Sequence, residues 1–288
     1  MASIRDLRRR IRSVQSTKQI TRAMKLVAAS KLRKAQETME RARPYAAGVK
    51  SLLGKLKSAA GEVSHPLLQE RDGNKTLMLV VSSDRGLCGG FNANLLKGAM
   101  NALKERSDRE VHLEICGKKA ADFFKSRSWE VRKHHADVLR DLSPENTRAV
   151  AHSLIQGFLD DGYDEVLVVS NRFKSVMAQD LVVERLLPAG QDDGDEAAAS
   201  ETGDYIYEPS AAELLGSIVP RSVETIVHQV LLESYAAEMG ARMVAMETAT
   251  KNASEMIDKL TLIMNRKRQA AITTEIIEIV SGAAALEG

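Results

Sequence analysis

The stretch ESYAAEMGARMVAMETATKNASEMIDKLTLIMNRKRQAAITTEIIEIVSGAAAL, Glu233–Leu286, decides the fold of this chain. Good helix formers occupy nearly all of its positions. We expect breaks at Pro209 and Pro220, and one helix over Val223–Leu286 within a C-terminal segment of residues 210–288. At ~1.5 Å per residue this helix would be roughly 95 Å long. A domain of this size does not need such a length, which indicates that something outside the domain uses the helix.

Residues spaced by alternating threes and fours form one seam along this helix. Its members are Leu232, Tyr235, Met239, Arg242, Met246, Ala249, Ala253, Met256, Leu260, Ile263, Ala270, Ile277 and Ala284. A seam of this kind is typical of a coiled coil and predicts a helical partner.

The N-terminal segment, residues 1–58, supplies that partner, because one heptad phase covers residues 3–57. The a-type positions are Ile4, Ile11, Lys18, Lys25, Leu32, Met39, Ala46 and Leu53. The d-type positions are Leu7, Val14, Thr21, Ala28, Ala35, Ala42, Val49 and Leu56. We predict an antiparallel two-helix coiled coil, with Pro44 on the face opposite the seam as a kink.

Polar residues interrupt this seam at Lys18, Thr21 and Lys25. The lysine stems could snorkel out of the interface, or the residues could serve a function, and the pattern leaves both explanations open.

Residues 75–208 predict a Rossmann-like open sheet inserted between the two helices. The expected strands are Thr76–Ser83, Val111–Cys116, Glu165–Ser170 and Met177–Leu187. The expected helices are Asn92–Arg106, Lys118–Ser126 and Ser143–Asp161. The acidic stretch Gln191–Gly203 is expected to be a mobile loop, followed by a short strand at Asp204–Glu208. The overall expectation is an α/β fold with a long antiparallel coiled coil.

The motif SDRGLCGGFN, Ser83–Asn92, is the strongest candidate for a phosphate cradle, because it follows a strand and precedes a helix. Its glycines do not fit G-x-G-x-x-G, and Asp84 would repel an anion, so a tight turn is favoured. Cys88 could be a reactive thiol at that helix start, but its interpretation as a small buried residue in a turn is favoured. The histidines lack metal-ligand spacing. We predict no catalytic, cofactor-binding or metal site.

Composition agrees with helix packing and gives no sign of a membrane span. The hydrophobic fraction is 44%, the aromatic fraction is 4%, and the formal net charge is +2. No apolar run approaches the ~20 residues that cross a bilayer. The basic N-terminal helix could contact nucleic acid, anionic lipid or an acidic protein, or it could be solvated.

The far end of the chain is apolar in several directions. In Ala270–Leu286, aliphatic side chains occupy most faces of the predicted helix, which predicts a surrounding protein collar. The polar cluster Asn265–Gln269, with Thr273 and Glu275, can make charge-assisted contacts at the edge of such a collar.

With these motifs in view, the chain resembles the γ-subunit family of bacterial rotary ATP synthases over essentially its whole length. The resemblance is carried by the stretches Ile4–Gln36, Arg43–Ala46, Ser82–Leu95, Asp204–Ser210, Ala241–Ala253 and Arg266–Leu286. The last of them matches the family signature through Ile272, Thr273, Glu275, Glu278, Gly282 and Ala283.

The resemblance implies a non-catalytic central rotor stalk, peripheral at the cytoplasmic face of the bacterial plasma membrane. It implies rotation inside a hexamer of α and β subunits, a foot that meets the ε subunit and the membrane c-ring, and a possible inhibitory subunit. It also implies no cofactor, no nucleic acid and no direct membrane insertion. The implied coupling or rotor–stator contacts are Met24, Arg242, Arg268, Gln269, Thr273 and Glu275. Tyr205 and Glu208 are implied to lie near the ring.

Two other hypotheses stay open on the residues alone. One is a nucleotide-binding α/β protein with helical extensions. The other is a coiled-coil adaptor for nucleic acid or a membrane surface.

Overall fold

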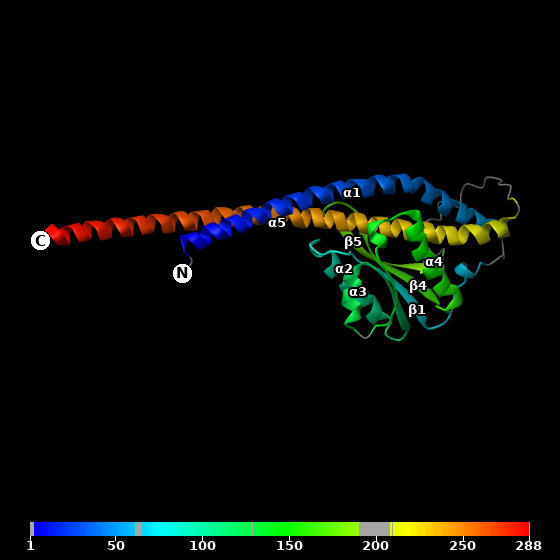
Figure 1. The fold of residues 1–288 in the computed structure, drawn as a ribbon. Coiled ribbons are helices and arrows are strands. Elements are labelled where there is room, and N and C mark those ends of the chain that lie inside the picture. The colour runs from blue at the N-terminus through cyan, green and yellow to red at the C-terminus, as the bar shows by residue number, and fades with distance from the viewer. Residues whose placement is uncertain (1–2, 61–64, 128, 190–207, 209, 288) are drawn as a thin grey trace. The chain divides into compact units, whose positions relative to one another are not determined.

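The computed structural model describes residues 3–60, 65–127, 129–189, 208 and 210–287 (Figure 1). The chain forms two compact units. One consists of Met1–Ala28 and Met243–Gly288, and we call it the terminal unit. The other is Ala29–Arg242, the central unit. Both long helices, α1 (Ile4–Ala60) and α5 (Ala211–Glu287), contribute residues to each unit.

The central unit contains one mixed sheet. In the described residues its strands are β1 (Lys75–Val81), β2 (Glu110–Cys116), β3 (Val131–His135), β4 (Glu165–Phe173) and β5 (Gln179–Leu187). Their order in the sheet is β3-β2-β1-β4-β5. β1 pairs in parallel with β2 and β4, β2 pairs in parallel with β3, and β5 is antiparallel to β4. The predicted Rossmann-like open sheet between two long helices is confirmed.

Helices cover both faces of the sheet, so the alternate side chains of β1 enter different cores. Met78 and Val80 pack with α2 (Phe91–Glu105) and α3 (Lys118–Lys125). Leu77, Leu79 and Val81 pack instead with α4 (Pro144–Asp160) and with the part of α5 that belongs to the central unit. This double burial explains why β1 is a continuous apolar run in the sequence.

The break that we expected at Pro220 is absent, because Pro220 lies inside α5. A proline ring removes one helix hydrogen bond and crowds the carbonyl group of the residue four positions earlier. That residue is Gly216, which is exposed and has open space around it, so water can reach its carbonyl group. Buried residues on both sides of the proline, Val219 and Val223, hold the helix together.

The heptad prediction for α1 is confirmed by burial: every a-type and d-type residue of the phase is buried or half-buried. Pairing with α5 is antiparallel, because Thr21 contacts Thr250 while Lys25, further along α1, contacts Glu247, which comes earlier in α5. In the central unit, Leu32 of α1 packs in one cluster with Met239. Pro44 lies inside α1, and a kink there stays a prediction.

The other predicted elements agree with the structure to within a few residues at their ends, and β3 was missed. β3 reads VRKHH and has all but its last residue exposed, so it lacks the apolar pattern of a buried strand. Two short 3-10 helices, Pro66–Leu68 and Val138–Arg140, were also not predicted. The predicted loop Gln191–Gly203 lies outside the described residues, and so does the predicted strand Asp204–Glu208 except for Glu208.

Candidate functional site

Two of the three polar residues in the α1 seam, Thr21 and Lys25, pair with polar residues of α5 inside the terminal unit. Thr21 is buried, and its Oγ1 lies 2.8 Å from Oγ1 of Thr250. Nζ of Lys25 donates to Oε1 of Glu247 at 2.7 Å. Polar contacts at seam positions fix the register of two helices, because sliding would leave them unpaired. Lys18 and Met24 beside them are half-buried.

The loop after β1 satisfies its own polar groups. The backbone N–H of Ser83 donates to Oδ1 of Asn92 at 3.1 Å, and Nδ2 of Asn92 donates to Oγ of Ser83 at 2.8 Å. Asp84 accepts a 3.1 Å hydrogen bond from the backbone N–H of Lys118, at the start of α3. A carboxylate at a helix N-terminus satisfies a free donor and stabilises the helix. The loop is therefore built as a turn, as the sequence favoured.

Arg242 of α5 occupies the carbonyl side of this loop. Its guanidinium donates to the backbone carbonyl oxygens of Gly86 and Arg85 and forms an ion pair with Glu238. The residue is only 8% exposed. Carbonyl oxygens attract a cation and repel a phosphate, so the group bound at the carboxyl end of β1 is the protein's own arginine. In open α/β sheets this end is where ligands usually bind.

The partner of Arg242, Glu238, is buried, and burial disfavours the charged form of its carboxyl group. Burial raises the pKa of Glu238, while the hydrogen bond and charge of Arg242 act to lower it, and the net pKa is raised. Two further groups complete the site: Phe91 and Cys88 pack against Ala237. Burial also raises the pKa of the Cys88 thiol, which agrees with a packed side chain rather than a reactive thiolate.

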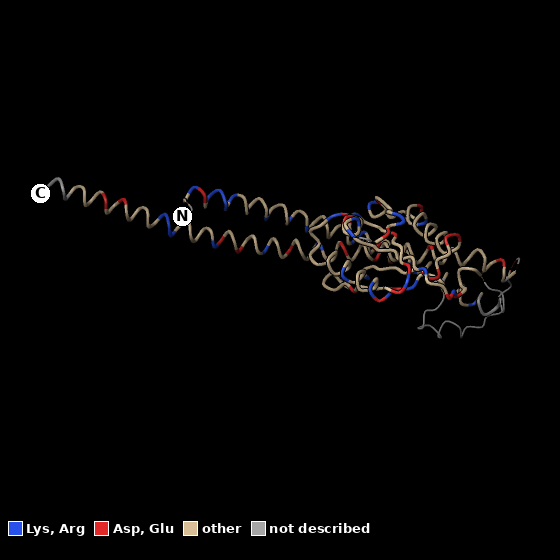
Figure 2. Tube along the Cα trace, turned by 90° about the horizontal axis from the view of Figure 1, so that it is seen from below, with Lys and Arg blue, Asp and Glu red and all other residues tan. Residues whose placement is uncertain are grey.

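The end of α5 has the opposite character, because every described side chain from Arg268 to Ala283 is exposed. This segment holds Arg268, Gln269, Thr273 and Glu275. Large aliphatic side chains are exposed there too: Ile272, Ile276, Ile277, Ile279 and Val280. Figure 2 shows how few charges this stretch carries; beyond Arg268 the charged residues are Glu275, Glu278 and Glu287.

The exposure follows from the helix register within the terminal unit. The pair Thr21–Thr250 places the start of α1, Ile4, opposite about residue 267 of α5, since antiparallel partners change in step. Leu7, near that start, is buried. Beyond about residue 268, no described residue of α1 is left to pair with α5.

The residues predicted as contacts therefore fall into different settings. Arg268, Gln269, Thr273 and Glu275 share one exposed helix end, Met24 is half-buried in the coiled coil, and Arg242 is buried in the central unit. Glu208 is exposed, and Tyr205 lies outside the described residues. Their predicted roles as contacts stay predictions.

Sequence reasoning missed Glu238, Thr250 and Glu247, which complete the polar contacts of Arg242, Thr21 and Lys25. The spacing of Glu238 four residues before Arg242 is a known helix ion-pair pattern and could have identified the first. The other two become visible only once the antiparallel register is known.

The described residues contain no group of three or more His, Cys, Asp or Glu side chains that could hold a metal ion. No helix among them combines the length and the apolar character needed to cross a membrane.

Comparison with known proteins gives matches over the whole length. The family model described as ATP synthase matches residues 3–286. The ATP synthase gamma chain of Geobacter sp. (strain M21) is 48% identical over 291 residues, and that of Pelotomaculum thermopropionicum is 47% identical over 287 residues. Both alignments cover 100% of each chain.

Among solved structures, the central stalk and c-ring of the Tetrahymena thermophila mitochondrial ATP synthase matches with a TM-score of 0.59 at 25% identity, covering 80% of this chain and 99% of that chain. The Euglena gracilis mitochondrial ATP synthase (OSCP/F1/c-ring, rotational state 3) matches with a TM-score of 0.66 at 18% identity, covering 98% and 94%, which supports the fold alone. On the strength of the full-length matches, the chain belongs to the ATP synthase gamma chain family.

Proposed function

We propose that the chain is the central-stalk subunit of a proton-translocating ATP synthase. It rotates inside a hexamer of α and β subunits and couples proton flow through a membrane ring to ATP synthesis. Its full-length relatives are ATP synthase gamma chains, and one structural match is a central stalk with its c-ring.

The observation that carries this proposal is the exposed end of α5. Ile277 is 59% exposed and Ile279 is 71% exposed, on a helix that has no partner from α1 at this level. Aliphatic side chains exposed around a helix are an aggregation hazard unless another protein covers them. A hexamer that encloses the helix removes that hazard, and the small residue Ala283 suits a bearing that must turn.

The coiled coil suits the transmission of torque. Two long helices packed antiparallel resist bending more than one helix does, and the polar pairs Thr21–Thr250 and Lys25–Glu247 oppose sliding of one helix along the other. The two helices must keep their register if torque applied at one end of the coiled coil is to reach the other end.

Specific contacts follow from this role. The exposed residues Arg268, Gln269, Thr273 and Glu275 contact the stationary hexamer, and Met24 lies at the rotor–stator boundary. Arg242 contributes to coupling from inside, through its contacts with Glu238 and the loop after β1. Tyr205 and Glu208 face the c-ring, where the ε subunit also binds; an inhibitory subunit is a further possible partner.

In this proposal the chain is non-catalytic and holds no cofactor, since the α and β subunits carry the nucleotide chemistry. It works at the cytoplasmic face of the bacterial plasma (inner) membrane, as a peripheral part of the complex, and neither inserts in the bilayer nor binds nucleic acid.

The test is reconstitution with the α and β subunits. The full chain should co-purify with the hexamer and raise its ATPase turnover, whereas a chain truncated after Gln269 should keep its folded central unit but lose most of the effect. Isolated α and β subunits are the control. If the full chain neither co-purifies with the hexamer nor changes its turnover, the proposed function is wrong.

A further inference from the structure

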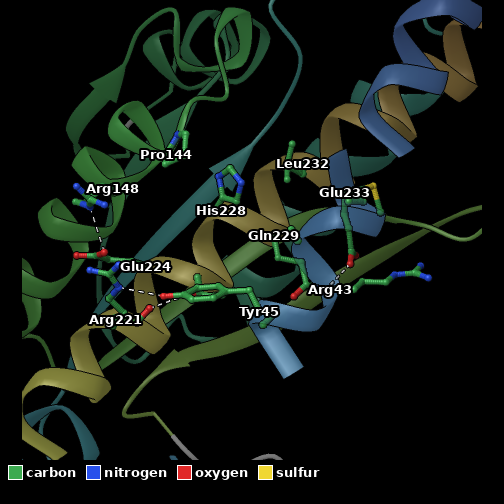
Figure 3. Close-up of a pocket in the computed structure, with 14 residues that line it drawn as sticks. Arg43, Tyr45, Pro144, Arg148, Arg221, Glu224, His228, Gln229, Leu232 and Glu233 are labelled. Carbon is green, nitrogen blue, oxygen red and sulfur yellow. Dashed lines mark hydrogen bonds and ion pairs between the residues drawn. The ribbon is translucent and has the colours of Figure 1, made fainter. Parts of the chain in front are cut away.

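A pocket of about 250 Å³ lies among α1, α4 and α5 in the central unit. Its floor is apolar and is formed by Met39, Ala42, Ala46 and Leu232. The side chains of Tyr45 and His228 also line the pocket (Figure 3). The volume is below the range of about 300–1,000 Å³ that is typical of pockets for drug-sized molecules, so a ligand would be small.

The residues that line the pocket extend along α5. Its lining includes Glu224 and Glu233, and nine residues of helix span roughly 13 Å. Figure 3 shows Arg148, Glu224 and Arg221 at one end, and Glu233 with Arg43 at the other. A lining of this length, with apolar side chains in it, fits an extended chain better than a compact ring system.

The carboxylates in the lining already have cationic partners. Glu224 accepts from Nε of Arg148 at 3.2 Å and lies 2.8 Å from Nε2 of His152. Glu233 lies 3.7 Å from Nε of Arg172 and accepts from Gln229 at 3.0 Å. Each carboxylate of the lining therefore already has a cationic partner.

Two arginines of the lining, Arg221 and Arg43, are exposed and form no ion pair with a described residue. Nε of Arg221 donates to the hydroxyl oxygen of Tyr45 at 3.0 Å, and this bond holds the guanidinium at its end of the pocket. A guanidinium that is positioned but forms no ion pair can bind a carboxylate through two parallel hydrogen bonds.

We propose that this pocket binds a medium-chain monocarboxylate, with its alkyl chain along Met39, Ala42, Ala46 and Leu232 and its carboxylate on Arg221. The apolar floor excludes a hydrophilic anion such as phosphate as the preferred ligand. The lining contains three arginines and two glutamates, which favours an anionic ligand over a cationic amphiphile.

The test uses the full chain labelled with ¹³C at its methionine methyl groups and titrated with octanoate. Met39 is the methionine in the lining, so its methyl signal, assigned with Met39→Leu, should shift alone among the 11 methionines and saturate. For a ligand of this size the expected Kd is on the order of 1 mM or below. Octanol, which has the same chain without the charge, should bind at least about tenfold more weakly.

Three variants locate the site. Arg221→Gln should weaken octanoate binding about tenfold and leave octanol binding unchanged. Thr225→Leu, which adds volume at the pocket wall, should abolish both, with thermal melting to check that the fold is kept. Arg140→Gln removes an exposed arginine that pairs with Asp137 outside the pocket, and it should change neither.

Several results would overturn the proposal. Octanol binding as tightly as octanoate would show that charge plays no part. Shifts of many methyl signals without saturation would indicate non-specific association. A shift of the Met39 signal with protein concentration alone would identify a second copy of the chain as the occupant.

Discussion

The two parts of α5 belong to one continuous helix but differ in how far their aliphatic side chains are buried. In the central unit, Leu215, Val219, Val223, Val227 and Leu231 recur at intervals of four, and each is at most 1% exposed. In the terminal unit, no described side chain after Ala253 is buried. Helix propensity therefore accounts for the formation of α5 as a helix. The elements that pack against each part of α5 determine whether its aliphatic residues stabilise the fold or stay available to another protein.

Polar residues show the same contrast. In the central unit the ion pair of Arg242 and Glu238 is buried, so each charge depends on the other. In the terminal unit the pair of Lys25 and Glu247 is partly exposed, and water can replace either partner. Exposed ion pairs contribute little to stability, whereas breaking a buried one is costly.

The largest expected effect tests the comparison with a matched pair of leucines. Leu231→Ala, in the buried part of α5, should lower the free energy of unfolding of the central unit by about 2–5 kcal/mol, because it leaves a cavity. Leu262→Ala, at a site that is 59% exposed, should cost about 0.5 kcal/mol or less. Urea unfolding followed by circular dichroism measures both. Equal losses would contradict the contrast between the two parts.

The next effect concerns the buried ion pair. Arg242→Ala should destabilise the central unit by about 3 kcal/mol, because Glu238 and the carbonyl groups of Arg85 and Gly86 lose their donor. Adding Glu238→Gln should recover part of the loss, since it removes the unpaired charge. Arg266→Ala, at an exposed position of the same helix, is the control and should change little. Failure of Glu238→Gln to recover any stability would show that the loss does not come from the stranded carboxylate.

A smaller effect should appear as a dependence on pH. The pKa of Glu238 is raised in the folded chain above its ordinary value near 4.5, so the folded state binds the proton more tightly than the unfolded state does. This group's contribution to stability is unfavourable at neutral pH and improves as pH falls through the folded pKa toward 4.5. In Glu238→Gln that change should vanish, while Glu247→Gln should keep it. Unfolding free energies measured at several pH values between about 4 and 7 make the comparison.

The sequence was sufficient for the elements whose pattern is periodic. The heptads of α1 and the seam of α5 predicted the coiled coil because burial on one side of a helix leaves a regular spacing. The continuous apolar run over β1 predicted a strand buried on both faces, because a sheet covered on both sides needs no polar face. β3 was missed because an exposed edge strand needs no apolar alternation, and Pro220 was misjudged because the packing of Val219 and Val223 overrides the local cost of a proline.

The candidate site was less predictable, because its contacts join residues far apart in the chain. Nothing in SDRGLCGG indicates that its carbonyl groups meet Arg242, some 156 residues later. The pocket beside Tyr45 likewise requires the register of α1 against α5 and the place of α4. The exposed end of α5, in contrast, was foreseeable from the sequence, since aliphatic residues on most faces of a helix are a local property.

The smallest expected effect on stability is also the sharpest test of what the exposed end does. Replacing Arg268 and Gln269 together with alanine should change the free energy of unfolding by less than about 0.5 kcal/mol, because both side chains are exposed and alanine favours a helix. In the reconstituted complex the same variant should change ATPase turnover at least about twofold, since charge-assisted contacts to the hexamer are lost. Lys251→Ala, another exposed position of α5, is the matched control. A variant that leaves the stability of the chain unchanged and yet alters ATPase turnover must act through a contact with another protein. An unchanged turnover would show that these two side chains are not part of the rotor–stator contact.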